Sequence, residues 1–182
     1  MSLPGLLIAA AFAQSGMNQE AGVVTSYVRG GSFDGPGVAA HYLWAPSDVF
    51  ALGPMVDVAY LSSGLNVGNR LPASYAFTST FAGGLFLLRL PLHGAEPYAG
   101  LGLGYVHAAP QRSVNTQCGL RSGFGGLLTA GVRKAVSDQF TLGLRGSARS
   151  AAFEQNCAAV GGPADFDVPV LFALSSTLDY RW

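Results

Sequence analysis

The sequence predicts an all-β fold, an eight-stranded antiparallel up-and-down transmembrane β-barrel, and three observations predict it. Apolar residues alternate with polar or small residues at a period of two over segments of roughly ten residues, which is typical of a strand with one face in lipid. Only 11% of the 182 residues are charged, against roughly 25% in an average soluble domain, and the mean hydropathy is +0.34. Outside the N-terminus, no stretch approaches the roughly 20 consecutive apolar residues of a spanning helix.

The N-terminus is interpreted as a secretory signal peptide over residues 1–13. Its apolar run, residues 3–13, has about the length of a signal-peptide core and is too short to span a membrane. The run ends in Ala11-Phe12-Ala13, a small-x-small cleavage pattern, and the polar Gln14 follows. We therefore expect residues 14–21 to form an N-terminal periplasmic segment and residues 22–182 to form the barrel.

The first four strands are predicted at residues 23–31, 38–44, 50–60 and 77–88. The phase of the first strand is ambiguous. In the second and third strands, alternate apolar residues define the face that points outward: Val38, Ala40, Tyr42, Trp44, Phe50, Leu52, Val56, Val58 and Tyr60. In the fourth strand the alternation predicts an outward Phe77, Phe81, Leu85 and Leu87, although Phe86 and Leu88 interrupt the pattern.

The other four strands are predicted at residues 99–105, 124–133, 140–149 and 168–182. The fifth alternates Gly100, Gly102 and Gly104 with the apolar Ala99, Leu101, Leu103 and Tyr105. Eight strands enclose a lumen that side chains can fill, so we expect these glycines to leave room for Arg and Tyr side chains from across it. Outward aromatic residues near the strand ends predict two interfacial girdles: Trp44, Phe50, Tyr60, Phe77, Tyr105, Phe124, Phe140, Tyr180 and Trp182.

The connections between strands alternate in length. Short turns are predicted at residues 45–48, 91–96 and 135–138, and longer loops at residues 30–37, 62–74, 108–122 and 151–167. Short turns on one side and longer loops on the other are typical of outer-membrane barrels. An even number of strands places both termini on the short-turn side, which would be the periplasm.

Two segments carry a family resemblance. Residues 96–105, Glu-Pro-Tyr-Ala-Gly-Leu-Gly-Leu-Gly-Tyr, are similar to a Pro-Tyr-x-Gly-x-Gly-x-Gly strand of the OmpA-like transmembrane domains, the small eight-stranded outer-membrane barrels of Gram-negative bacteria. Leu178, Tyr180 and Trp182 resemble the C-terminal signal that the barrel-assembly machinery reads. The resemblance implies an outer-membrane location in a Gram-negative bacterium, with periplasmic chaperones and the assembly machinery as partners during biogenesis.

Charged residues on the inward face predict a polar network in the lumen. By parity this set contains His41, Asp57, Arg133, Arg145, Arg149, Asp179 and Arg181. A buried charge must be paired or hydrated. One interpretation is a structural plug of ion pairs; the other is a gate for a small pore, opened when the pairs exchange partners.

Cys118 and Cys157 are the two cysteines, and both fall in predicted outward loops. These loops flank the sixth and seventh strands and therefore lie at the same rim. An exported chain passes through an oxidising periplasm, so we expect a disulfide. No histidine or second cysteine pair accompanies them at ligand spacing, so no metal site is predicted.

The sequence does not indicate an enzyme. Eight-stranded lipid A deacylases share this architecture and use a His-x-Ser pair, but His41, His93 and His107 have no serine two positions on. His107 could lie at the outer rim near Ser62 or Ser122, yet nothing in the sequence brings them together. The zero net charge and the absence of a Lys/Arg cluster exclude a nucleic-acid binder.

We therefore predict a monomeric outer-membrane barrel with a structural or surface-interaction role, surrounded by outer-membrane lipid, without catalysis, cofactor or metal. Three alternatives remain open at this point. The first is a narrow, porin-like gated channel for ions or small solutes. The second is a soluble lipocalin-like barrel with its apolar face inside. The third is a lipid-modifying outer-membrane enzyme, which needs a serine hydroxyl beside an imidazole.

Overall fold

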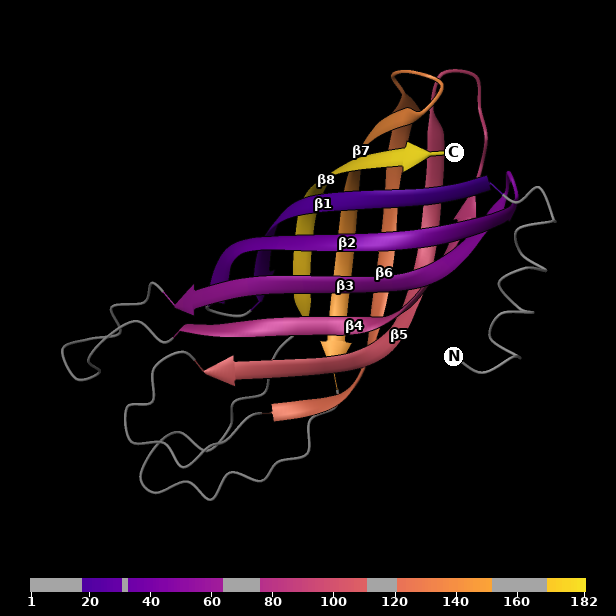
Figure 1. The fold of residues 1–182 in the computed structure, drawn as a ribbon. Helices are drawn as coiled ribbons and strands as arrows, with labels where there is room; N and C mark the ends of the chain where they lie inside the picture. Colours follow the sequence, from indigo (N-terminus) through magenta and orange to yellow (C-terminus); the bar gives the residue numbers. More distant parts are fainter. Residues whose placement is uncertain (1–17, 31–32, 64–75, 111–120, 152–169) are drawn as a thin grey trace, which may run out of the picture.

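The computed structural model describes residues 18–30, 33–63, 76–110, 121–151 and 170–182. Within these ranges the chain forms eight strands: β1 (Asn18–Gly30), β2 (Phe33–Ser47), β3 (Phe50–Ser63), β4 (Ala76–Arg89), β5 (Glu96–Pro110), β6 (Arg121–Ala135), β7 (Phe140–Ala151) and β8 (Leu171–Arg181). The strands form one closed sheet in sequence order, each antiparallel to the next (Figure 1). The predicted fold class is confirmed.

The first and last strands close the barrel. β1 pairs with β8 from Glu20, opposite Arg181, to Arg29, opposite Phe172. Backbone hydrogen bonds between Gln19 and Trp182 extend this seam, with N···O distances of 3.3 and 3.2 Å. Closure gives every strand two neighbours, so the sheet has no open edge, which is how a sheet satisfies its backbone polar groups in lipid.

The C-terminus and the short connections lie at one end, called here the turn end (Figure 1). Two residues separate β2 from β3, six separate β4 from β5, and four separate β6 from β7. In the β4–β5 connection Gly94 has a φ of +87°, a left-handed conformation that favours glycine because other residues carry a Cβ. The opposite end, where the longer connections begin, is called the loop end.

The first strand pair differs from the prediction at both ends. β1 begins at Asn18 rather than at Val23, so residues 18–21 belong to the barrel and not to a periplasmic segment. β2 begins at Phe33, which pairs with Gly30, so only residues 31–32 separate the strands where a loop over residues 30–37 was predicted. The β1–β2 ladder runs through Gly35 and Pro36, inside the predicted loop. Residues 1–17, with the predicted signal peptide, lie outside the described residues.

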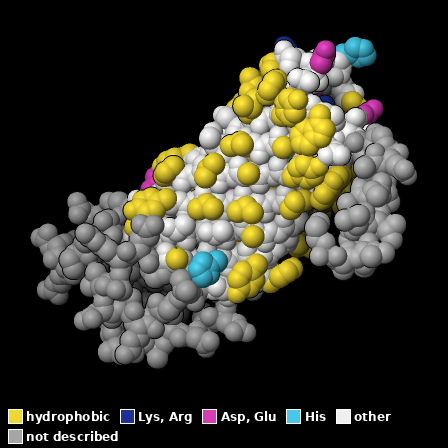
Figure 2. All heavy atoms as spheres, viewed as in Figure 1, with side chains coloured by type: hydrophobic (Ala, Val, Ile, Leu, Met, Phe, Trp, Pro, Cys, Tyr) yellow, Lys and Arg dark blue, Asp and Glu magenta, His cyan; other side chains and the backbone are white. Residues whose placement is uncertain are grey.

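The outer surface carries an apolar belt, and the alternative with the apolar face inside does not fit it. Its exposed residues come from every strand: Val23, Val38, Leu52, Val56, Phe86, Leu88, Leu101, Leu103, Leu128, Val132, Leu142, Leu144, Phe172, Leu174 and Leu178. Figure 2 shows hydrophobic side chains across the middle of the barrel, whereas the acidic side chains visible on this face lie toward its ends. A soluble lipocalin-like barrel would direct this belt inward. No helix long and apolar enough to cross a bilayer occurs within the described residues.

Aromatic side chains ring the turn end of the belt. Tyr42 packs against Trp44 and Trp182, with ring centroids 5.1 and 5.8 Å apart. Phe140 and Tyr180 continue the ring at a centroid distance of 5.1 Å. The predicted assembly signal thus lies on the outer face of β8, where Leu178 and Trp182 are exposed. Aromatic girdles of this kind mark the membrane–water interface of outer-membrane barrels.

The fourth strand has the opposite phase to the prediction. Phe81, Leu85 and Leu87 are buried in the lumen, while Phe86 and Leu88 are exposed on the belt. Phe77 does not face lipid either, because it packs against a buried lumen cluster and against Phe33. Both faces of this strand are apolar, so alternation alone could not distinguish them.

Candidate functional site

The lumen is filled by an apolar half and a charged half. The apolar half contains Val24, Leu43, Met55, Phe81, Leu85, Leu87, Val106 and Leu127. The glycines of β5 face this half, but leucines, rather than the predicted Arg and Tyr side chains, lie beside Gly100 and Gly102, and the backbone of Ala82 and Gly83 lies beside Gly104. A Cβ on Gly100 would lie 2.4 Å from Leu87 Cδ2, and one on Gly102 would lie 3.1 Å from Leu127 Cβ. Neighbouring strands therefore supply the filling side chains.

Glu20 is the centre of an ion-pair network at the turn end of the lumen. It is almost fully buried and accepts from three guanidinium groups of three different strands. Arg133 Nη1 donates to Oε1 at 2.5 Å, and Arg89 Nη2 and Arg181 Nε donate to Oε2 at 3.2 and 3.0 Å. Such charge-assisted hydrogen bonds are stronger than neutral ones.

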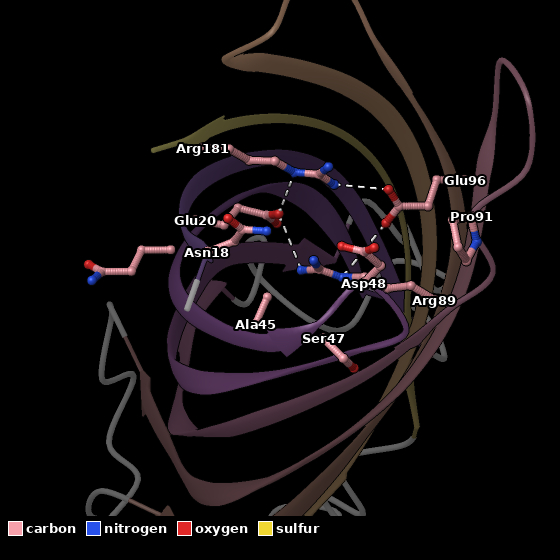
Figure 3. Close-up of a pocket in the computed structure, with 10 residues that line it drawn as sticks. Asn18, Glu20, Ala45, Ser47, Asp48, Arg89, Pro91, Glu96 and Arg181 are labelled. Carbon is pink, nitrogen blue, oxygen red and sulfur yellow. Dashed lines mark hydrogen bonds and ion pairs between the residues drawn. The ribbon is translucent and has the colours of Figure 1, made fainter. Parts of the chain in front are cut away.

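Glu96 is the second carboxylate of this network. Arg133 donates to its Oε1 through Nε at 2.9 Å and Nη2 at 2.5 Å, and Arg181 Nη2 donates to its Oε2 at 3.0 Å. Arg89 Nε lies 3.7 Å from the same Oε1. Figure 3 shows Glu20, Glu96, Arg89 and Arg181 converging at the mouth of the barrel. Three arginines and two glutamates therefore cross-link β1, β4, β5, β6 and β8 at this end.

A cavity of about 140 Å³ opens beside these side chains. Its lining includes Glu20, Arg89, Glu96 and Arg181, together with Ser47 and Asp48 from the β2–β3 hairpin. Arg181 retains 32% of its side-chain surface. The network is thus buried on its inner side and reached by water on its outer side.

His41 and Asp179 lie one layer deeper. His41 Nε2 is 3.2 Å from Asp179 Oδ1 and 3.8 Å from Glu20 Oε1. Gly22, between them on β1, makes this approach possible, because a Cβ there would lie 2.0 Å from Asp179 Oδ1 and 2.5 Å from His41 Nε2. A side chain at position 22 would therefore displace the histidine or the aspartate.

Glu20, His41 and Asp179 offer ligand atoms within 4.8 Å of one another, a spacing that a divalent cation could use. Arg133 Nη1 occupies the same space, at 2.5 Å from Glu20 Oε1 and 3.6 Å from Asp179 Oδ2. A cation here would lie against a guanidinium group, and repulsion between like charges opposes binding. The arrangement favours the ion pairs over a metal centre.

A second, smaller group lies nearer the loop end. Arg149 Nη1 donates to Asp57 Oδ1 at 3.1 Å, and its Nη2 donates to Ser79 Oγ at 3.1 Å. All three residues are buried. β3, β4 and β7 are thereby joined through the lumen.

Arg145 lies in the lumen without a carboxylate partner among the described residues. It is 3% exposed, and its Nη2 lies 4.0 Å from Met55 Sδ, a long contact. Its Nε has no hydrogen-bond partner in the part of the chain that the structure describes. Asp57 and Asp179 attract its charge electrostatically without forming an ion pair with it, and a buried charge that lacks a bonded partner is unfavourable. Arg145 is therefore less well compensated than Arg133, which binds two glutamates.

The structure places all seven predicted lumen residues on the inner face but not in one network. His41, Arg133, Asp179 and Arg181 belong to the turn-end group, Asp57 and Arg149 form the second group, and Arg145 stands apart. The predicted Cys118–Cys157 disulfide lies outside the described residues.

Three charged members of the turn-end network were missed by the sequence interpretation. Glu20 fell in the predicted periplasmic segment, Glu96 in a predicted turn, and Arg89 at the end of the strand whose phase was wrong. Arg89 carried a usable signal, because a charged side chain at that position disfavours a lipid-facing phase. Phe81, Leu85 and Leu87 lie on the same face of the strand as Arg89, so an inward Arg89 would have predicted that they fill the lumen.

A serine and a histidine that the sequence could not bring together are adjacent at the loop end. His107 Nδ1 lies 2.7 Å from Ser122 Oγ. The two residues are register partners on β5 and β6. His107 alternates with the buried Val106 and Ala108 on β5, and Ser122 has the parity of the exposed Phe124 on β6, so both side chains lie on the outer face.

Neither a family model nor a curated protein matches the sequence. Solved structures do match. Neisserial surface protein A has a TM-score of 0.63 at 14% identity, covering 92% of this chain and 97% of that chain. Ail, the attachment invasion locus protein of Yersinia pestis, has a TM-score of 0.53 at 15% identity, covering 91% of this chain and 97% of that chain. OprG from Pseudomonas aeruginosa has a TM-score of 0.54 at 9% identity, covering 92% of this chain and 96% of that chain. The chain has the fold of small eight-stranded outer-membrane barrels, and at these identities the likeness concerns the fold.

Proposed function

We infer from this fold that the protein is an outer-membrane barrel of a Gram-negative bacterium with a structural or surface-interaction role. The observation that carries the proposal is the reversal of polarity between the two faces of the sheet. Leucines such as Leu101, Leu103 and Leu128 are exposed on the outside, while Glu20, Arg133 and Arg145 are buried inside. In water this arrangement would be strongly unfavourable, whereas in a bilayer the belt is solvated by lipid.

The turn-end network supports a closed lumen. Glu20 and Glu96 bind guanidinium groups from three other strands and so tie five strands together across the lumen at this end. Breaking a buried pair leaves an uncompensated charge, which is strongly unfavourable. A role that depends on the rigid scaffold and its exposed loops is therefore favoured over transport. The surface and attachment names of two similar structures agree with such a role.

The experiment is a folding test. The chain is refolded into detergent micelles and into lipid vesicles, and its mobility on a denaturing gel is compared before and after boiling. We expect a heat-dependent shift and a β-type circular dichroism spectrum. A chain that folds without detergent and shows no shift would overturn the outer-membrane assignment.

A narrow channel is the second candidate, and one observation favours it. The cavity at the turn end reaches the Glu20–Arg89 and Glu96–Arg181 pairs, so water and ions have access to the groups that close the lumen. Exchange of partners among three arginines and two glutamates could open a path. Discrete conductance steps in a planar bilayer, altered by Glu20→Gln, would support it, and a silent bilayer would reject it.

A further inference from the structure

We propose that Ser122 and His107 form a nucleophile–base pair that acts on acyl esters of the lipids around the loop end of the barrel. The inference rests on the proposed membrane location and adds an activity to it. The main observation behind this proposal is the 2.7 Å distance between Ser122 Oγ and His107 Nδ1. This distance is within the range that a general base needs to take a proton from a nucleophilic hydroxyl.

The position of the pair on the barrel indicates its substrate. Tyr105 and Phe124 are register partners two residues nearer the middle of β5 and β6, and both are exposed, at 55% and 67%. Aromatic side chains at such positions mark the boundary between hydrocarbon and headgroups. His107 and Ser122 lie one step beyond this boundary, where the ester groups of membrane lipids are found.

The surroundings of the pair leave it accessible. Both side chains are partly exposed, and Thr80 is the register partner of His107 on the other side. Thr80, His107 and Ser122 thus form a polar row across β4, β5 and β6 on the outer face. A hydroxyl and an imidazole facing lipid are unfavourable in the hydrocarbon core, so this row is consistent with contact to polar lipid groups.

The reaction that this pair supports is a hydrolysis in two acyl-transfer steps. Ser122 Oγ attacks the ester carbonyl carbon while its proton passes to His107 Nδ1. The tetrahedral intermediate collapses, the carbon–oxygen bond to the lipid alcohol breaks, and the alcohol takes the proton from His107. Water then attacks the acyl-serine, His107 takes and returns one proton, and a fatty acid leaves. Ester and water are converted to acid and alcohol without any further reactant.

Within the described residues the pair has no carboxylate partner, so we expect a slow reaction. General-base assistance by one positioned imidazole contributes roughly 10²- to 10⁴-fold. His107→Asn should therefore reduce acylation of Ser122 by about two orders of magnitude or more, and Ser122→Ala should abolish it.

The test uses the full chain folded into vesicles. Release of fatty acid is measured from ester-linked phospholipids, from ether-linked phospholipids of the same headgroup, and from vesicles that contain lipopolysaccharide. A fluorophosphonate probe reports the reactive serine, and peptide mass spectrometry identifies it. Ser176→Ala is the matched control, because Ser176 is an exposed outward serine in the middle of β8.

We expect fatty acid from one or both ester-containing vesicles, none from ether lipids, and the probe on Ser122. Release from phospholipid alone or from lipopolysaccharide alone identifies the source of the ester. Equal release by the original chain and the Ser122→Ala variant, a probe adduct on another serine, or no adduct on a heat-modifiable barrel would overturn the proposal. Failure of the proposed location appears separately, as a chain without the mobility shift.

Discussion

Arg133 on β6 donates from Nη1 to Oε1 of Glu20 on β1 at 2.5 Å, although 113 positions separate the two residues in the sequence. β7 and β8 lie between their strands in the closed sheet, so the pair reaches across the lumen rather than along a ladder. The contact ties the beginning of the barrel to its second half. The contact forms when the barrel closes, so the effect of breaking it on stability reports on closure.

We predict that Glu20→Gln destabilises the barrel by about 3–5 kcal/mol, because the buried guanidinium groups of Arg89 and Arg133 and the half-buried one of Arg181 would lose a shared charge. The midpoint of the heat-induced gel shift in detergent measures the effect. Asp48→Asn is the control, since Asp48 is exposed in the β2–β3 turn. Equal midpoints for both variants would contradict a stabilising role for the network.

Arg145→Met should leave stability unchanged or raise it. Arg145 is buried without a carboxylate partner within hydrogen-bond distance in the described part of the chain, and Asp57 and Asp179 attract it only through longer-range electrostatics. Replacing such a poorly compensated buried charge by an apolar side chain of similar length removes a desolvation penalty. Arg133→Met, made in parallel, should lower the unfolding midpoint because it leaves Glu20 and Glu96 short of a partner. A large loss of stability from Arg145→Met would contradict this prediction and would show that Asp57 and Asp179 compensate the charge of Arg145.

Two adjacent glycines on β4 should differ in how much an alanine substitution lowers the stability of the barrel. A Cβ on Gly83 would lie 2.2 Å from the Leu103 carbonyl oxygen, whereas a Cβ on Gly84 meets nothing within 4 Å. Gly83→Ala forces two backbones apart and should destabilise by at least about 1–3 kcal/mol. Gly84→Ala should be close to neutral. The fraction of chain that becomes heat-modifiable after refolding separates the two variants.

Leu128→Arg should impair folding into vesicles by about 2–4 kcal/mol if Leu128 lies near the bilayer midplane. Leu128 is 59% exposed on the middle of β6, so in water the same change would be tolerated. Val136→Arg is the control, because Val136 is similarly exposed in the β6–β7 turn. Normal folding of both variants in vesicles would contradict a lipid-facing belt.

The disulfide between Cys118 and Cys157 stays a prediction. Alkylation of the oxidised chain under denaturing conditions, followed by mass spectrometry, should find no free thiol. Closing a loop of this length contributes roughly 3–4 kcal/mol in the chain-entropy model, so a reductant should lower the unfolding midpoint. Two alkylated cysteines in the chain isolated from an oxidising compartment would exclude the pairing.

Alternation along the sequence was sufficient to predict the number of strands, their order and most of their faces. In β5, for example, Leu101 and Leu103 had to be outward because Gly100, Gly102 and Gly104, which alternate with them, have no apolar side chain to offer lipid. β4 shows the limit of this reasoning. Phe81 and Phe86 are both apolar, and alternation cannot distinguish a lipid-facing side chain from one that fills the apolar half of the lumen.

The lumen network shows a different limit. That Arg133, Asp179 and Arg181 face inward follows from parity. Parity does not predict the partners of these side chains. Arg133 binds Glu20 and Glu96, whereas Arg145 binds no carboxylate within the described residues. These contacts depend on the stagger between strands, and a shift of two residues preserves every face while changing every partner across the lumen.

The sequence by itself therefore determined the class of fold and the two kinds of surface, because both are consequences of a period that each strand carries alone. Tertiary structure decided which charges pair, which glycines are irreplaceable, and that His107 and Ser122 are neighbours at the outer rim. The physical reason is that these relationships join strands whose register is set only when the sheet closes. Local pattern contains no information on that register.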